Sequence, residues 1–287
     1  MKFQEDPIII IGAGRSGTNI LRDVLTSFDE FVTWPCDEIN YIWRHGNRSF
    51  LSDAFTADMA RPDVANYIRT QFGKLARRHP GASLVEKTCA NTLRVSFLHQ
   101  IFPKARFIQL IRDGRDVALS AAERWKAPLD MGYVLKKAKY VPKSDLWYYA
   151  TRYLLNRFHR LTSREKRIAT WGPRFTGMEE VFRSNPVQVA CAIQWKHCVE
   201  SAAFAFKTIP KENVHSLKYE DLAFEPGGEF ERLFKFLELS PSESMIGKVS
   251  KISNKSVGRW RANTKPEISH RVSEKIHDTL VELGYEK

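Results

Sequence analysis

Short apolar runs separated by helical segments set the pattern of the chain. Four runs predict buried β-strands: Ile8–Ile11, Leu84–Val85, Phe107–Ile111 and, more weakly, Val214–Leu217. Such runs, alternating with helices, favour a parallel sheet that is covered by helices on both faces. We therefore expect an α/β fold with three layers, in which residues 1–287 form a single domain.

Three segments place apolar residues at helical spacing. The first follows a glycine-rich loop, the second follows Pro226-Gly227-Gly228, and the third begins near Pro266. Their apolar positions are Ile20, Leu21, Val24, Leu25 and Phe28; Phe230, Leu233, Phe234 and Leu237; and Ile268, Val272, Ile276 and Leu280. Residues 125–183 break this alternation, because aromatic and basic side chains crowd the stretch. We predict an irregular, partly helical insertion there.

The composition indicates a globular, basic protein. With 43% hydrophobic residues, the chain of 287 can bury a sizeable core. Its net charge of +12 suits a partner with several negative charges, and it leaves open a non-enzymatic protein that binds polyanions. The four cysteines form no CxxC pair, and no run resembles a signal peptide or a transmembrane segment. These features predict reduced thiols and a cytoplasmic location.

The first predicted strand runs into the glycine-rich loop Gly12-Ala13-Gly14-Arg15-Ser16-Gly17-Thr18-Asn19 and then into a helix. A strand, such a loop and a helix N-terminus together form an anion site, since backbone N–H groups and the helix dipole favour negative charge. The glycines match GxGxxG, so an NAD(P)-binding oxidoreductase is an alternative, although Asp37 and Glu38 come late for its acidic residue. Thr18 stands where a Walker A loop has lysine, which weakens a kinase interpretation.

A second segment, residues 105–120, predicts a strand that ends at Arg112 and a helix that carries Ser120. An arginine at the end of a strand can clamp a phosphate with its planar fork, and a serine two helical turns later can donate to the same group. The alternative is structural: Arg112, Asp113, Arg115 and Asp116 only pair with one another at the start of the helix.

The loop GAGRSGTN, followed about a hundred residues later by FIQLIRDGRDVALS, resembles the two segments with which sulfotransferases bind 3′-phosphoadenosine 5′-phosphosulfate (PAPS). The resemblance extends to Leu84–Thr88 and Ile101–Pro103, to Lys218–Leu222 and to Ser256–Trp260, and it is thin over residues 125–183. It implies a P-loop-like fold, PAPS as co-substrate and 3′-phosphoadenosine 5′-phosphate (PAP) as product. The sequence departs from the family pattern at Asn19 and before the late loop.

This resemblance also assigns roles to individual residues. The first loop would cradle the 5′-phosphosulfate with Gly14, Arg15, Ser16, Gly17, Thr18 and Asn19. Arg112 and Ser120 would hold the 3′-phosphate, and Tyr219 would sit at the adenine. A late loop would close over the nucleotide with Lys255, Gly258, Arg259 and Trp260.

Sulfuryl transfer needs a base for the acceptor proton and cations at the leaving phosphate. We expect Arg15 and Lys87 to supply the cations without a metal ion, although Lys87 could simply pair with Glu86. Glu38 is the expected base, and Asp37 suits a helix cap. Two histidines are alternative bases: His45 and His99.

The expected acceptor is a hydroxyl, most simply that of a carbohydrate in a glycan or glycolipid. Carbohydrate-modifying sulfotransferases carry a glutamate at the place that Glu38 matches. Residues 125–183 would bind the acceptor, with aromatic side chains stacking on sugar rings and basic ones meeting acidic groups. The sequence contains no recognisable nucleic-acid-binding motif, and it leaves the oligomeric state open.

Overall fold

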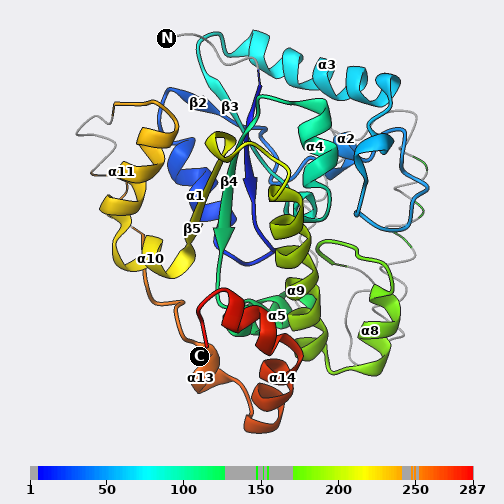
Figure 1. Cartoon of the computed structure of the whole chain (residues 1–287), viewed down its shortest axis with the longest axis vertical. Coiled ribbons are helices and arrows are strands. Elements are labelled where there is room, and N and C mark those ends of the chain that lie inside the picture. Colours follow the sequence, from blue (N-terminus) through cyan, green and yellow to red (C-terminus); the bar gives the residue numbers. More distant parts are fainter. Residues whose placement is uncertain are drawn as a thin grey trace.

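The computed structural model describes residues 6–126, 147, 151, 154, 171–240, 247, 249 and 252–286. Its strands form one parallel sheet in the order β2-β3-β1-β4-β5. They are β1 (Ile8–Ile11), β2 (Phe31–Val32), β3 (Ser83–Lys87), β4 (Arg106–Ile111) and β5 (Val214–Lys218). The parallel sheet with helices on both faces confirms the predicted fold class (Figure 1).

Alternating side chains of the central strand reach two separate cores, because successive residues of a strand point to opposite faces. Ile8 and Ile10 belong to the cluster on one face, and Ile9 and Ile11 to that on the other. The first face is covered by α1 (Thr18–Leu25), α10 (Tyr219–Phe224) and α11 (Pro226–Phe236). The second is covered by α2 (Asn40–Trp43), α3 (Pro62–Arg78) and α4 (Val95–Ile101).

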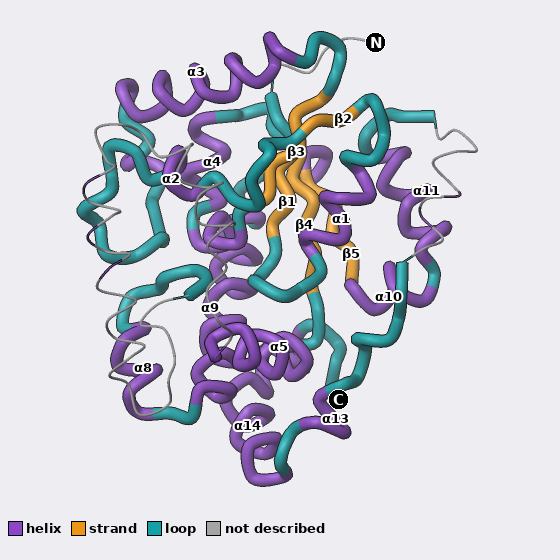
Figure 2. Tube along the Cα trace, turned by 180° about the vertical axis from the view of Figure 1, so that it is seen from behind, coloured by secondary structure: helices purple, strands orange, loops and turns teal. Residues whose placement is uncertain are grey.

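A third core lies beyond the carboxyl ends of the strands and involves α5, α14 and part of α9; Figure 2 shows α5 and α14 at one end of the molecule, with α9 extending from them toward the sheet. Residues of α5, α9 and α14 make up most of this core. Its helices and the remaining short elements are α5 (Gly114–Lys126), α8 (Met178–Ser184), α9 (Val187–Phe206), α13 (Trp260–Asn263), α14 (Pro266–Glu282), and the 3-10 turns η1 (Ala57–Met59), η2 (Cys89–Leu93) and η4 (Lys211–Asn213).

The predicted elements are present, with some corrections. Strand β3 is longer than expected, and the helix after residue 225 begins at Pro226 itself, because proline suits the first position of a helix. Ile20 was expected on a buried face, but it is 38% exposed and borders a pocket. Strand β2 and helix α9 were not anticipated. The apolar residues of helix α9 are spread around most of its circumference, with polar residues such as Lys196 and Glu200 among them, so the amphipathic signal is weak.

The insertion predicted at residues 125–183 lies largely outside the described residues. Trp125 lies near the end of helix α5 and packs in the third core. Continuous description of the chain begins again at Trp171, before helix α8. Most of the basic and aromatic side chains expected to grip a glycan fall between these two points. Among the helices that the structure describes, none is both long and apolar enough to cross a bilayer.

Candidate active site

The carboxyl ends of the strands surround a pocket of about 380 Å³. Strand β1 has β3 on one side and β4 on the other, so the chain order reverses here, and open α/β sheets bind ligands at such a switch point. We call this space the basic pocket. Its lining comes from the end of each described strand and from two later segments: Gly14, Arg15, Gly17, Thr18, Asn19, Ile20, Asp37, Glu38, Lys87, Cys89, Arg112, Ser120, Trp171, Tyr219, Ser256 and Arg259.

The first loop makes a tight turn immediately before the N-terminus of helix α1. Arg15 and Gly17 both adopt positive φ, 76° and 91°. Arginine rarely adopts this conformation, and strained residues of this kind cluster at ligand sites. At Gly17 a Cβ atom would overlap the ring of Tyr219, so a glycine is required there. The loop therefore packs closely against Tyr219, the residue that follows β5.

Three polar side chains of the two sequence motifs meet in the basic pocket. The Nε of Arg15 donates to Ser120 Oγ at 3.0 Å, and Arg112 Nη1 donates to the carbonyl of Arg15 at 3.0 Å. Burial, followed by the positive charges of Arg124 and Arg112, lowers the pKa of the Arg15 guanidinium. An anionic ligand in the pocket would offset the mutual repulsion of these guanidinium groups.

Two buried polar atoms beside the first loop have no hydrogen-bond partner among the described residues: Ser16 Oγ and Arg112 Nε. Buried polar groups are rarely left unsatisfied, because the missing bond costs about 1–3 kcal/mol. Ser16 itself does not line the basic pocket, although its neighbours do. These orphaned donors fit an oxyanion ligand such as a phosphate or sulfate ester.

Arg112 is held rigidly from several sides. Its Nη2 donates to the carbonyl of Ser256, and its guanidinium carbon lies 4.4 Å from the centroid of the Tyr219 ring. Tyr219 in turn shares a hydrogen bond of 2.8 Å with Ser256 Oγ. Asp116 lies 3.7 Å from the same guanidinium. The structural pairing considered from sequence is thus present, and Arg112 lines the pocket at the same time.

Lys87 ends strand β3 and faces two carboxylates across the pocket. Its Nζ lies 3.2 Å from Asp37 Oδ1 and 3.1 Å from Glu38 Oε1, while Glu38 Oε1 also accepts from the N–H of Cys89 at 3.2 Å. Burial alone would lower the pKa of the Lys87 ammonium, but the carboxylates outweigh it and the pKa is raised. Lys87 therefore stays charged, and its Nζ positions the carboxyl group of Glu38 beside the pocket.

Glu86 points away from Lys87 and is not its direct partner. The Glu86 carboxylate is buried, and it accepts from Thr88 Oγ1 at 2.5 Å and Asn91 Nδ2 at 2.7 Å. Burial raises the pKa of Glu86 to about 7.

The helix cap expected at Asp37 is absent, and this expectation was wrong. Helix α2 begins at Asn40 after Ile39, and no side chain caps it. Asp37 instead accepts from Arg22 Nη1 at 2.6 Å and pairs with Lys87. Its role is to fix these two cations at the edge of the pocket.

The late loop reaches the pocket at Ser256 and Arg259. Asp116 anchors this loop, because its carboxylate accepts from the N–H groups of Gly258 at 2.6 Å and Trp260 at 2.9 Å. The ring of Trp260 packs between Arg115, 4.3 Å from its centroid, and Arg261. The other three late-loop candidates, Lys255, Gly258 and Trp260, do not line the pocket.

The two histidines proposed as alternative bases lie elsewhere. His45 stacks on Tyr67 at a centroid distance of 3.7 Å, and His99 sits on helix α4. Sequence reasoning missed Ser256, Trp171 and Cys89 as pocket residues. Ser256 opens the late-loop motif and could have been included, whereas Trp171 lies in a segment with no matching motif.

Comparison with known proteins identifies the fold and the family. A model of the sulfotransferase family matches residues 7–169, more than half of the chain. The chain belongs to the sulfotransferase family. No curated protein matches it.

Solved structures of sulfotransferases share its fold. The sulfotransferase domain from the curacin biosynthetic pathway is 14% identical with a TM-score of 0.56, over 96% of this chain and 99% of that chain. Sulfotransferase STF9 from Mycobacterium avium is 12% identical with a TM-score of 0.53, over 96% and 76%. Mouse sulfotransferase SULT7A1, complexed with PAP, is 14% identical with a TM-score of 0.51, over 96% and 85%.

Family membership identifies the chain as a transferase. It also displaces the NAD(P)-binding interpretation of the first loop, because the glycine spacing is shared but the family is that of sulfotransferases. Among the described residues no group of three or more His, Cys, Asp or Glu could hold a metal ion.

Proposed function

We propose that this sulfotransferase moves the sulfuryl group of PAPS to a hydroxyl of a carbohydrate-bearing acceptor, with Glu38 as the general base. The observation that carries this proposal is the meeting of Arg15, Arg112 and Ser120 with Lys87 and Glu38 in one pocket. The first three suit the phosphates of the donor, and the last two suit the chemistry at the acceptor oxygen.

The donor would lie along the two motifs. The loop from Gly14 to Asn19, with the unpaired Ser16 Oγ, suits the 5′-phosphosulfate. Arg112, whose Nε is unpaired in the described structure, suits the 3′-phosphate together with Ser120. Tyr219 lines the same pocket and would support the adenine, and Arg259 would close the late loop over the nucleotide.

The reaction forms a bond between the acceptor oxygen and sulfur and breaks the bond between sulfur and the 5′-phosphate oxygen. Glu38 would take the acceptor proton, since its carboxyl group lines the pocket beside Lys87. Lys87 and Arg15 would stabilise the negative charge that develops on the departing phosphate. In-line displacement then leaves PAP, a sulfate ester and a proton on Glu38.

Transfer of label from radioactive PAPS tests the proposal directly. The protein should label members of a panel of glycans and glycolipids, and calorimetry should show binding of PAP but not of NAD. A protein that binds neither PAP nor PAPS would refute the donor assignment. Association with every polyanion offered, in a steeply salt-dependent manner and without turnover, would support a polyanion-binding protein instead.

A further inference from the structure

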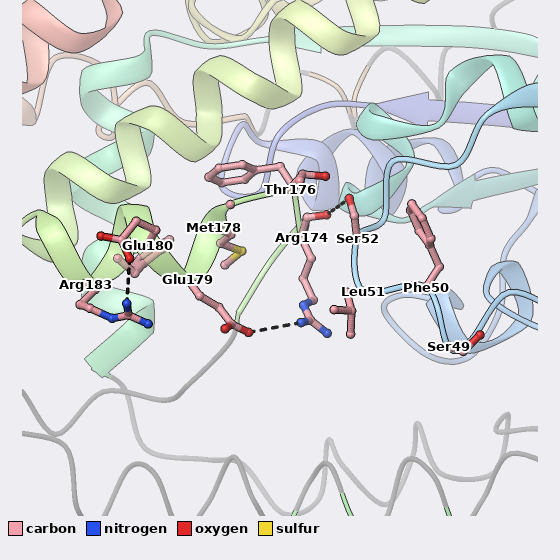
Figure 3. Close-up of a pocket in the computed structure, with 13 residues that line it drawn as sticks. Ser49, Phe50, Leu51, Ser52, Arg174, Thr176, Met178, Glu179, Glu180 and Arg183 are labelled. Carbon is pink, nitrogen blue, oxygen red and sulfur yellow. Dashed lines mark hydrogen bonds and ion pairs between the residues drawn. The ribbon is translucent and has the colours of Figure 1, made fainter.

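A second pocket, of about 650 Å³, lies between the loop before η1 and the segment that leads into α8. Ligand sites for small molecules have this size and consist mostly of apolar walls with a few polar groups. We call it the apolar pocket. Its lining is drawn in Figure 3: Ser49, Phe50, Leu51, Ser52, Arg174, Phe175, Thr176, Gly177, Met178, Glu179, Glu180, Phe182 and Arg183.

The charged side chains that line the apolar pocket form two ion pairs. Arg174 lies 3.9 Å from Glu179, and Arg183 lies 2.8 Å from Glu180 (Figure 3). Each arginine therefore has a carboxylate as its partner. The pocket surface between the two ion pairs includes the apolar side chains of Phe, Leu and Met residues. Leu51 is 71% exposed. A neutral, aliphatic ligand suits this surface, whereas a phosphate or sulfate would meet both carboxylates.

The two pockets are close neighbours along one short segment. Trp171 lines the basic pocket, and Arg174, three residues later, lines the apolar pocket. Three residues of chain span at most about 11 Å. Gln194 of helix α9 fixes this segment, because its Nε2 donates to the carbonyls of Trp171 at 3.0 Å and Pro173 at 2.9 Å. The segment from Trp171 to Arg174 therefore borders both pockets.

Hydrogen bonds connect the two segments that line the apolar pocket to the region just after Glu38. Asn40 Nδ2 lies 3.5 Å from Asp53 Oδ1, and Asp53 Oδ2 accepts from the N–H of Arg174 at 2.8 Å. Ser52 Oγ donates to the Arg174 carbonyl at 2.8 Å, which joins the two walls to each other. Asp53 is buried between them. These contacts connect the walls of the apolar pocket to Asn40, two residues after Glu38.

We infer that the apolar pocket binds an aliphatic chain of the acceptor, while the acceptor's hydroxyl lies at Glu38. The acceptor class is then an amphiphile, a sugar that carries an alkyl or acyl chain. This inference rests on the proposed function for the position of the hydroxyl, but chain binding can be measured without turnover.

Binding of methyl, hexyl, octyl and decyl β-glucosides, measured by calorimetry below the concentration at which they form micelles, tests the inference. A chain buried in the pocket lowers Kd by up to about four-fold for each methylene. Kd should therefore fall steeply from the methyl to the decyl compound. Equal Kd values across the series would overturn the inference, even if PAP binds and glycans are labelled.

Two matched variants locate the chain. Leu51→Asp places a carboxylate in the apolar lining, and Phe204→Asp places one at a site with similar exposure, 73%, outside both pockets. The dependence of Kd on chain length should be flattened in Leu51→Asp and kept in Phe204→Asp. The same loss, or none, in both variants would contradict the assignment of the chain to this pocket.

Labelled PAPS then separates this inference from the proposed function. Octyl glucoside should either accept label or inhibit labelling of a glycan acceptor. If it binds and does neither while glycans are labelled, the pocket does not serve the acceptor, and the inference fails alone. If the alkyl series binds as expected but the protein neither binds PAP nor transfers label, the proposed function fails instead.

Discussion

The Nε of Arg15 donates a hydrogen bond of 3.0 Å to the Oγ of Ser120, across 105 positions of sequence. This contact joins the loop after β1 to helix α5, so the two donor-binding motifs support each other before any ligand arrives. Arg112 adds a second contact between the two motifs, because its Nη1 donates to the carbonyl of Arg15. The two motifs therefore form one unit, and a change in either should be felt by the other.

Arg112→Ala should weaken PAP binding by about 2 kcal/mol or more, because a charge-assisted contact with the 3′-phosphate is lost. Ser120→Ala should cost less, because only a hydroxyl is removed. Calorimetry with PAP measures both, and circular dichroism verifies that the variants are folded. Unchanged affinity in a folded Arg112→Ala protein would sink the assignment of the 3′-phosphate site.

Glu38→Gln should lower turnover by about 10²-fold or more while PAP affinity is kept, since a general base acts on the acceptor proton and not on the donor. Asp37→Asn should be milder in turnover and cost about 1 kcal/mol of stability, because it weakens the pairing with Arg22 and Lys87. Single-turnover transfer at saturating acceptor measures the first effect. If Glu38→Gln transfers at the wild-type rate, the base lies elsewhere.

Asp116→Asn should loosen the late loop. The substitution weakens the carboxylate bonds to the N–H groups of Gly258 and Trp260, and hydrogen bonds to charged groups contribute about 1.5–3 kcal/mol. We expect faster dissociation of PAP in stopped-flow measurements and a lower melting temperature. Glu123→Gln, which neutralises the exposed partner of Arg259 and leaves the Asp116 bonds to the loop in place, is the control and should change both less than Asp116→Asn does. Equal behaviour of the two variants would show that Asp116 does not hold the loop.

Because of Glu86, the free energy of unfolding should fall as pH rises. Burial raises its pKa from 4.5 in the unfolded chain to about 7, so between these values the folded state binds more protons than the unfolded state. Its carboxyl is neutral at pH 4.5 and must ionise in the core above pH 7. Glu86→Gln removes this dependence, so it should gain a few kcal/mol relative to wild type between pH 5 and pH 8. Urea unfolding of both proteins at the two pH values checks this, and parallel pH profiles would contradict it.

The sequence was sufficient where chemistry and local pattern coincide. The apolar run of β1 and the glycine spacing after it indicated the loop, and the strand that ends before Arg112 indicated the second motif. Both lie in the basic pocket, together with Lys87 and Glu38. Parallel strands deliver their ends to one edge of the sheet, so residues that follow strands can be grouped without knowing the structure.

Tertiary contacts decide what the sequence could not. Asp37 has the right residue type for a helix cap, but Arg22 and Lys87 hold it from other elements. Trp260 was expected to close over the nucleotide, and the sequence pattern did not predict that Arg115 and Arg261 lie over its ring. Such outcomes depend on which cations arrive from distant segments. The spacing of hydrophobic positions along the sequence carries no information about these contacts.

The basic pocket draws its lining from positions between Gly14 and Arg259, nearly the whole length of the chain. During synthesis, the donor site cannot be completed until the late loop has left the ribosome. A ligand that binds only the folded state stabilises it by mass action. Partly made chains lack the late-loop wall and gain little from the donor, so PAPS would selectively protect finished molecules against proteolysis.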